Sequence, residues 1–268
     1  MNQKEELDQV MQTLAQFASI NGGITSDNIY IFLKNYGLDF KNVDKRIEAN
    51  DLEQIYNILE QKSSERKVDF VSAPLDEGWN FFSTNMNHGG KFDFQWKVYI
   101  PLLSEHYGFA VKNIISFLAN NGFISECLFS GTMRSATMIV NLTDPDDVTL
   151  LNKFIDGNIY LKGCLGKHQP FVPDFNGIGV LRGYDNDTSF TQRVANYLSA
   201  FINACQQAQR LDLITIDEFY KSLKYSLKCG SLSEPSAAKQ VIGHLDVILN
   251  GLDYVYDDCY QNSYRKSL

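Results

Sequence analysis

A lysine and a tyrosine lie two residues apart in the alternating run Trp96-Lys97-Val98-Tyr99-Ile100. Alternate side chains of a β-strand share a face, so Lys97 and Tyr99 would project together, with backbone positions roughly 6–7 Å apart. An ammonium group beside a phenol can hold an anion and exchange a proton with it. The simpler interpretation is an amphipathic strand with a hydrated outer face, and this pattern alone does not separate the two.

Two isolated arginines could add to such a site. Arg134 comes just before an apolar strand, and Arg193 lies in the first turn expected for a helix capped by Ser189. The free N–H groups at a helix N-terminus together with a guanidinium group favour an anion. Arg193 could equally pair with Asp185 or Asp187, and the sequence leaves both interpretations open.

The histidines are weaker candidates. His168 directly precedes a Gln-Pro-Phe segment, and His88 lies in a glycine-rich turn. Loops carry function more often than core elements do, so these two could reach a cleft, with His168 preferred. We expect structural roles for His106 and His244, because each lies on an amphipathic helix.

Composition limits the classes of function. The chain has 268 residues with a net charge of −8, which argues against nucleic acid or an anionic membrane surface as a partner. The apolar runs are too short for a membrane span, and the polar N-terminus does not resemble a secretory signal. Five widely spaced cysteines indicate neither a zinc site nor a disulfide framework. We therefore expect a reduced, cytoplasmic protein, while secretion without a hydrophobic signal stays open.

Helical and strand patterns divide the chain. Residues 4–62 carry apolar side chains at helical spacing, and we interpret 1–68 as a helical N-terminal subdomain. From residue 69 short apolar segments alternate with turns, so 69–268 is expected to be an α+β domain with a helical C-terminal part. The predicted fold is α+β, with a mainly antiparallel or mixed sheet flanked by helices. Expected strands include 96–100, 123–129, 135–142, 159–161, 171–172 and 178–181, and expected helices include 105–120 and 236–255.

The order of these pieces resembles a known family. Lys97-x-Tyr99 followed by proline, the lone Arg134, a Pro-Phe-x-Pro segment, Gly-x-Gly-Val and Ser-Phe-x-x-Arg193 follow one another in that order. This succession resembles the HopA-type effector family and the lyase domains of class III and class V lanthipeptide synthetases. More distantly it is similar to the phosphothreonine lyases secreted by type III systems. The resemblance covers roughly residues 90–205.

The resemblance implies β-elimination of phosphate from phosphoserine or phosphothreonine, giving a dehydroamino acid. That chemistry needs a base for the Cα proton, an acid for the leaving oxygen and cations for the phosphate. By resemblance, Lys97, Arg134 and Arg193 would contact the phosphate, and Tyr99 would be the general acid. No metal or organic cofactor is implied.

The sequence departs from the family at the base. Active phosphothreonine lyases carry a lysine on the strand before the lone arginine, whereas the strand here contains Glu126 and Cys127 in that neighbourhood. A carboxylate of ordinary pKa is a weak base toward a Cα–H bond, and a thiol needs a lowered pKa to act. Lys91, beside a glycine-rich turn, could supply a base from another strand or be a surface lysine.

Two functions therefore follow from the sequence. The first is a phospho-Ser/Thr lyase-like enzyme, as in lanthipeptide biosynthesis. It would act on a precursor peptide that a separate kinase has phosphorylated. The second is a catalytically degenerate protein of the same fold that binds a peptide or protein partner, including as a secreted effector. His168 is retained as a substrate-binding candidate in either case.

Overall fold

The computed structural model describes residues 2–43, 45–75, 78–84, 93–182 and 189–250. Four residues weighed above, His88, Lys91, Asp185 and Asp187, lie outside these ranges. The described residues form two compact units. The helical unit draws them from 2–36, 169–173 and 189–250, and the sheet unit draws them from 37–168 and 174–182.

The expected 1–68 subdomain is divided between these units. Helices α1 (Gln3–Asn21) and α2 (Ser26–Lys34) belong to the helical unit, whereas α3 (Ala49–Ser64) belongs to the sheet unit. The division therefore differs from a boundary at residue 68. Its reason is packing, since α3 contacts α4 and β1 while α1 and α2 contact α7.

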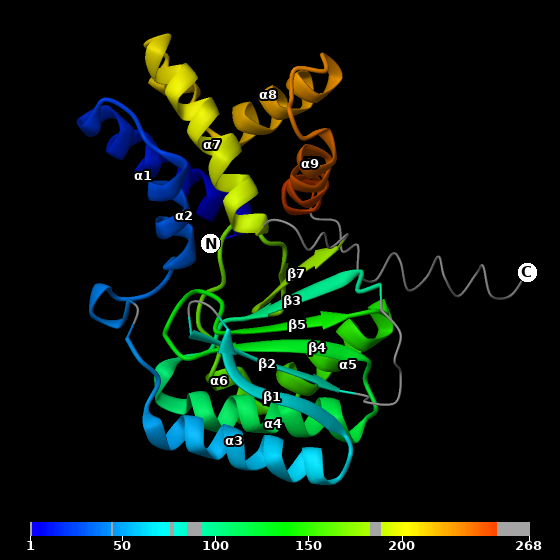
Figure 1. The fold of residues 1–268 in the computed structure, drawn as a ribbon. Coiled ribbons are helices and arrows are strands. Elements are labelled where there is room, and N and C mark those ends of the chain that lie inside the picture. Colours follow the sequence, from blue (N-terminus) through cyan, green and yellow to red (C-terminus); the bar gives the residue numbers. More distant parts are fainter. Residues whose placement is uncertain (1, 44, 76–77, 85–92, 183–188, 251–268) are drawn as a thin grey trace, which may run out of the picture. The chain divides into compact units, whose positions relative to one another are not determined.

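A seven-stranded antiparallel sheet organises the sheet unit, which confirms the predicted fold class (Figure 1). Its spatial order is β1-β2-β4-β5-β3-β7-β6. The central strand β5 pairs with β4 on one side and with β3 on the other, so β3 and β4 project side chains in register with the same residues of β5. The strands are β1 (Val68–Leu75), β2 (Trp79–Thr84), β3 (Trp96–Ile100), β4 (Ser125–Ser130), β5 (Met138–Leu142), β6 (Asp174–Phe175) and β7 (Ile178–Arg182).

One face of this sheet is the apolar core. Val98, Cys127 and Val140 point into it from β3, β4 and β5, and each is fully buried. Helices α3 and α4 (Tyr107–Asn120) run side by side against this face, as Figure 1 shows. Helices α5 (Pro145–Asp156) and α6 (Ile159–Gly163) add Leu151 and Leu161 to the same core. Because alternation places the remaining strand residues on the opposite face, that second face carries the candidate chemistry.

The helical unit contains α1, α2, α7 (Phe190–Gln207), α8 (Ile216–Lys228) and α9 (Pro235–Asn250), with α7 contacting the other four (Figure 1). Side-chain caps start three of these helices. Asn2 and Glu5 form a reciprocal capping box on α1, and the hydroxyls of Thr25 and Thr215 accept backbone N–H groups of α2 and α8. Short 3₁₀ turns lie at Phe40–Asn42, Ser104–His106 and Leu211–Leu213.

Two expected strands are wrong. Residues 159–161 begin helix α6, because the Asn158 side chain accepts hydrogen bonds from the backbone N–H groups of Tyr160 and Leu161. That cap outweighs the β-propensity of Ile-Tyr-Leu. Residues 171–172 form a turn rather than a strand, and the Val172 N–H donates to the Gln169 carbonyl.

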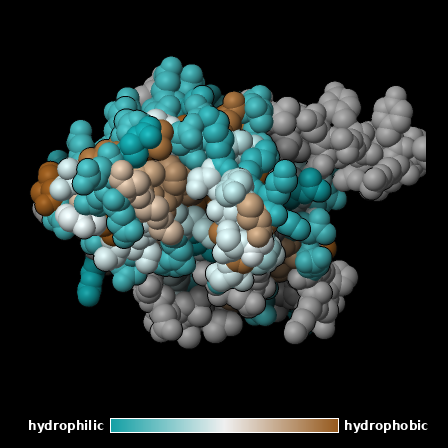
Figure 2. All heavy atoms as spheres, turned by 90° about the horizontal axis from the view of Figure 1, so that it is seen from above, coloured by the Kyte–Doolittle hydropathy of each residue, from teal (hydrophilic) through white to brown (hydrophobic). Residues whose placement is uncertain are grey.

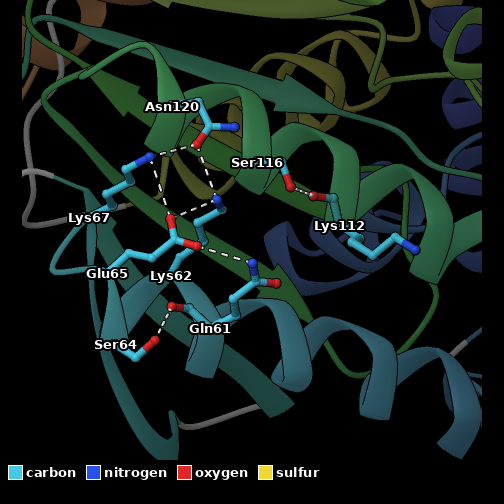
Figure 3. A network of polar contacts seen from close by, with 8 residues as sticks. All are labelled: Gln61, Lys62, Ser64, Glu65, Lys67, Lys112, Ser116 and Asn120. Carbon is cyan, nitrogen blue, oxygen red and sulfur yellow. Dashed lines mark hydrogen bonds and ion pairs between the residues drawn. The ribbon is translucent and has the colours of Figure 1, made fainter.

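A polar network joins the C-terminal ends of α3 and α4 (Figure 3). The Asn120 side-chain oxygen accepts hydrogen bonds from the ammonium groups of Lys62 and Lys67, both at 3.1 Å. The Glu65 carboxylate bridges the same two lysines at 2.9 and 3.4 Å, and the hydrogen bond from Lys62 lowers the pKa of that carboxyl group. Cations at helix C-termini also offset the negative end of the dipole. The network therefore links α3 and α4, two of the helices that pack on the core face.

Exposed apolar side chains occur in both units. In the view of Figure 2 hydrophilic residues cover most of the surface, and hydrophobic colour is confined to scattered areas. In the helical unit Ile20, Ile31 and Tyr225 are more than half exposed, and in the sheet unit Ile159 and Tyr160 are exposed to a similar degree. Single exposed apolar residues are common on protein surfaces and do not by themselves mark a docking site. Within the described ranges, the helices are too short or too polar to cross a membrane.

A buried tyrosine ties α4 to the sheet and gives a test of this packing. The Tyr107 hydroxyl donates to the backbone carbonyls of Ser130 at 2.7 Å and Thr137 at 3.2 Å. Tyr107→Phe should lower the free energy of unfolding by about 1–3 kcal/mol, because the two buried carbonyl groups then lose the hydroxyl that donates to them. Tyr160→Phe, at an exposed position of the same unit, should leave it unchanged. Equal stabilities of the two variants in urea denaturation would contradict this role for Tyr107.

Candidate functional site

Lys97 and Tyr99 share the second face of the sheet, as their alternation predicts. Their strand neighbours Trp96, Val98 and Ile100 point into the core. The Lys97 ammonium nitrogen lies 5.6 Å from the centre of the Tyr99 ring, within range of a cation–π interaction. Tyr99 is only 5% exposed. The cation and the phenol are therefore close neighbours.

Burial changes the acid–base behaviour of Lys97. Desolvation lowers the pKa of its ammonium group from 10.5 to about 8. At pH 7 the group is then mostly charged, with roughly a tenth in the neutral form. An ammonium group that has lost part of its hydration gains more from an incoming anion than a surface lysine does.

The register of β5 adds two residues to this face. Asn141 is the pairing partner of Lys97 on one side and of Glu126 on the other. Lys97, Asn141 and Glu126 therefore form one row across β3, β5 and β4. Neighbouring strands lie about 4.8 Å apart, so Lys97 and Glu126 are roughly 10 Å apart at the backbone. Burial raises the pKa of the Glu126 carboxyl group, which makes its carboxylate a stronger base than a surface glutamate.

The choice between Glu126 and Cys127 is resolved by their orientation. Cys127 points into the core, is 0% exposed and has a thiol pKa raised to about 12 by desolvation. A thiolate there is unfavourable, and the sulfur faces away from Lys97. Glu126 lies on the face of Lys97 and Tyr99. Of the two residues, only Glu126 can serve a site on this face.

Asn141 was missed from the sequence because it lies in an apolar run. The signal was present, since Met138-Ile-Val-Asn-Leu142 contains one polar side chain in an otherwise apolar strand. Asn141 is 2% exposed, and its side-chain oxygen Oδ1 has no hydrogen-bond partner among the described residues. A buried acceptor without a donor is uncommon in folded proteins and calls for an explanation.

Arg134 is placed on a different part of the sheet unit. It lies in the connection between β4 and β5, and its guanidinium carbon is 4.6 Å from the centre of the Trp79 ring. Its Nη2 donates to the Thr132 hydroxyl at 3.0 Å. Trp79 belongs to β2, and β4 and β5 separate that strand from β3. These contacts place the guanidinium group against Trp79, and its role as a phosphate contact stays a prediction.

Arg193 lies in the helical unit, in the first turn of α7. The helix begins after Ser189 as expected, but the Ser189 side chain makes no capping hydrogen bond. The Arg193 Nη1 donates to the Gln240 side-chain oxygen of α9 at 2.9 Å. Asp185 and Asp187, the alternative partners, lie outside the described residues. Participation of Arg193 in phosphate binding stays a prediction.

His168 pairs with a carboxylate. Its Nε2 lies 2.8 Å from Asp174 Oδ1, and the same oxygen accepts the Gly177 N–H at 3.0 Å. This pair fixes the start of β6 and β7. A substrate contact by His168 stays a prediction, as does the catalytic role considered for Lys91, which is not among the described residues.

Comparison with known proteins shows the fold. No protein-family model matches the sequence, and no curated protein matches it. Among solved structures, an effector protein from Pseudomonas syringae pv. tomato strain DC3000 matches with a TM-score of 0.57 at 11% identity, covering 88% of this chain and 98% of that one. An effector protein from Pseudomonas syringae pv. syringae strain 61 matches with a TM-score of 0.47 at 12% identity, covering 77% and 94%.

The lowered pKa of Lys97 gives a pH-dependent stability. Since the folded-state pKa of about 8 is below the ordinary 10.5, the unfolded chain binds this proton more tightly, and the native protein gains stability as pH rises from 8 to 10.5. Lys97→Met should therefore raise the free energy of unfolding at pH 7, by at most about 3 kcal/mol, with a smaller gain at pH 10.

Tryptophan fluorescence in urea can follow this, because Trp79 and Trp96, the two tryptophans of the chain, both lie in the sheet unit. Lys153→Met, at an exposed position on α5, is the matched control and should show no such pH-dependent difference. A gain for Lys97→Met that is equal at both pH values would contradict the lowered pKa.

Proposed function

We propose that the second face of the sheet binds a phosphorylated serine or threonine of a peptide and that the chain is a phospho-Ser/Thr lyase. The observation that carries the proposal is the pairing of the desolvated Lys97 ammonium with the Tyr99 phenol on one face of β3. The first supplies charge for a phosphate dianion, and the second supplies a proton beside it.

In the proposed reaction a base removes the Cα proton and the Cα–H electron pair forms the Cα=Cβ bond. The Cβ–O bond breaks as Tyr99 donates its proton to the bridging oxygen, and inorganic phosphate leaves. Lys97 stabilises the negative charge on the phosphate. Glu126 is the proposed base, because it shares the row of Lys97 and burial raises its pKa. Arg134 and Arg193 remain proposed phosphate contacts.

Synthetic peptides that contain phosphoserine or phosphothreonine test the proposal. Mass spectrometry should detect loss of phosphoric acid and formation of a dehydroamino acid, with the cognate kinase and precursor peptide supplied where simple peptides fail. Lys97→Ala and Tyr99→Phe should each slow elimination about 100-fold or more, because each removes a group that acts in the transition state. The control Lys153→Ala should keep full activity. Formation of dephosphorylated serine or threonine, or no reaction at all, would contradict the lyase assignment.

A second candidate function is partner binding without turnover, including as a secreted effector. The observation that favours it is the fold shared with a Pseudomonas syringae effector protein over nearly the full length of both chains. The absence of lysine from β4, where Glu126 is the acidic residue, also fits a degenerate site.

Affinity capture with wild-type protein and with the Lys97→Ala, Arg134→Ala double variant separates the two functions. A partner that both proteins retain, together with no elimination from phosphopeptides, would favour the second function. Binding that requires phosphate on the partner and both cations on the chain would count against it.

A further inference from the structure

The unpaired acceptor of Asn141 distinguishes it from other buried asparagines of the same unit. The Asn80 side-chain oxygen accepts the Tyr56 hydroxyl at 2.9 Å. Asn152 donates to the Phe175 carbonyl at 2.7 Å, and its oxygen accepts from Asn176 at 3.0 Å. These side chains hold parts of the unit together, whereas Asn141 Oδ1 makes no such bond within the part of the chain that the structure describes. Keeping that oxygen buried costs stability, which indicates a use outside the fold itself.

The position of Asn141 indicates what that use is. It lies between Lys97 and Glu126 in the row across the second face. An amide oxygen only accepts hydrogen bonds, so it cannot bind the oxygens of a phosphate dianion. It can bind a donor that is held next to the phosphate. The backbone N–H of a phosphorylated residue is such a donor.

The spacing fits a phosphorylated residue within a peptide. Residues directly opposite on paired strands have Cβ atoms about 4.5–5.5 Å apart, which sets the separation of the Asn141 and Lys97 side chains at their base. In phosphoserine the bonds N–Cα, Cα–Cβ and Cβ–O separate the backbone nitrogen from the bridging oxygen, a span of roughly 3–4 Å by ordinary bond lengths. One residue can therefore reach both side chains.

We propose that Asn141 is a substrate-binding residue whose Oδ1 accepts the backbone N–H of the phosphorylated residue while Lys97 holds its phosphate. The inference rests on the proposed phosphate-binding function of this face and adds a specificity to it. The site selects phosphoserine or phosphothreonine in a peptide with a free amide N–H. Because the residue is then held at both its N–H and its phosphate, its orientation is fixed. Its Cα–H bond therefore keeps one direction on the face that carries Glu126.

The test compares two synthetic peptides, one with phosphoserine between alanines and one in which the phosphoserine nitrogen is methylated. Their affinities are measured by calorimetry in the Tyr99→Phe background, so that neither peptide is consumed. With Asn141 present, methylation should weaken binding about ten-fold, the usual effect of losing one hydrogen bond to a buried acceptor. In Asn141→Ala the unmodified peptide should bind about ten-fold more weakly, and methylation should have no further effect.

Two controls separate this contact from a structural role. Asn141→Ala should keep the affinity for inorganic phosphate and should not lower the melting temperature, because it removes an acceptor to which no described residue donates. The matched variant Asn80→Ala changes a buried asparagine on the core face, so it should lower stability and leave the ten-fold effect of methylation intact.

If methylation of the peptide weakens binding to Asn141→Ala as much as it weakens binding to the protein with Asn141, the two losses of affinity are independent. That result would overturn the proposed contact of Asn141 with the backbone N–H and would leave phosphate binding in place. Failure of the protein with Asn141 to bind either inorganic phosphate or the phosphopeptide would instead overturn the proposed function, and this inference with it.

Discussion

The pairing of β5 with strands on both sides is the constraint on which the candidate site depends. Hydrogen bonding to β3 and β4 fixes which residues of three strands lie in one row, and a slip of one residue would move the whole row to the core face. That register brings Lys97, Asn141 and Glu126 together from segments far apart in the sequence. The core residues on the opposite face, including Val98, Cys127 and Val140, enforce it because they cannot be exposed without cost.

Much of the secondary structure could be predicted from local patterns. The helices at 107–120 and 235–250, the caps at Thr25 and Thr215, and strands β3, β4, β5 and β7 agree with apolar periodicity and turn residues. Local patterns failed at 159–161, where a short apolar run is ambiguous and the Asn158 cap decides. The spatial order of strands could not be predicted, since it depends on contacts between distant segments. The division into two discontinuous units has the same origin.

The candidate site was predictable only in part. Alternation was enough to place Lys97 and Tyr99 on one face, because that rule is local. The face on which Glu126 lies could also be predicted. Phe123, Cys127 and Phe129 are separated by even numbers of residues and share the core face, which leaves Glu126 on the other face. The contact of Arg134 with Trp79 could not be predicted, because Trp79 comes from a strand 55 positions earlier in the chain. The position of Asn141 between two charged residues likewise depends on how β5 pairs with β3 and β4, which local sequence patterns do not show.

The helical unit is built from segments that precede and follow the sheet unit in the sequence, and this affects how the protein can fold during synthesis. The Ile24 carbonyl accepts hydrogen bonds from Ser199 and Asn203 of α7, at separations of 175 and 179 residues. Helices α1 and α2 are synthesised before the sheet unit, yet their partner α7 emerges only after the last described strand of that unit. Closing so long a loop is slow, so the sheet unit can fold while the first two helices still lack their partner. Their apolar faces stay exposed during that interval, and transiently exposed apolar surface is prone to aggregation.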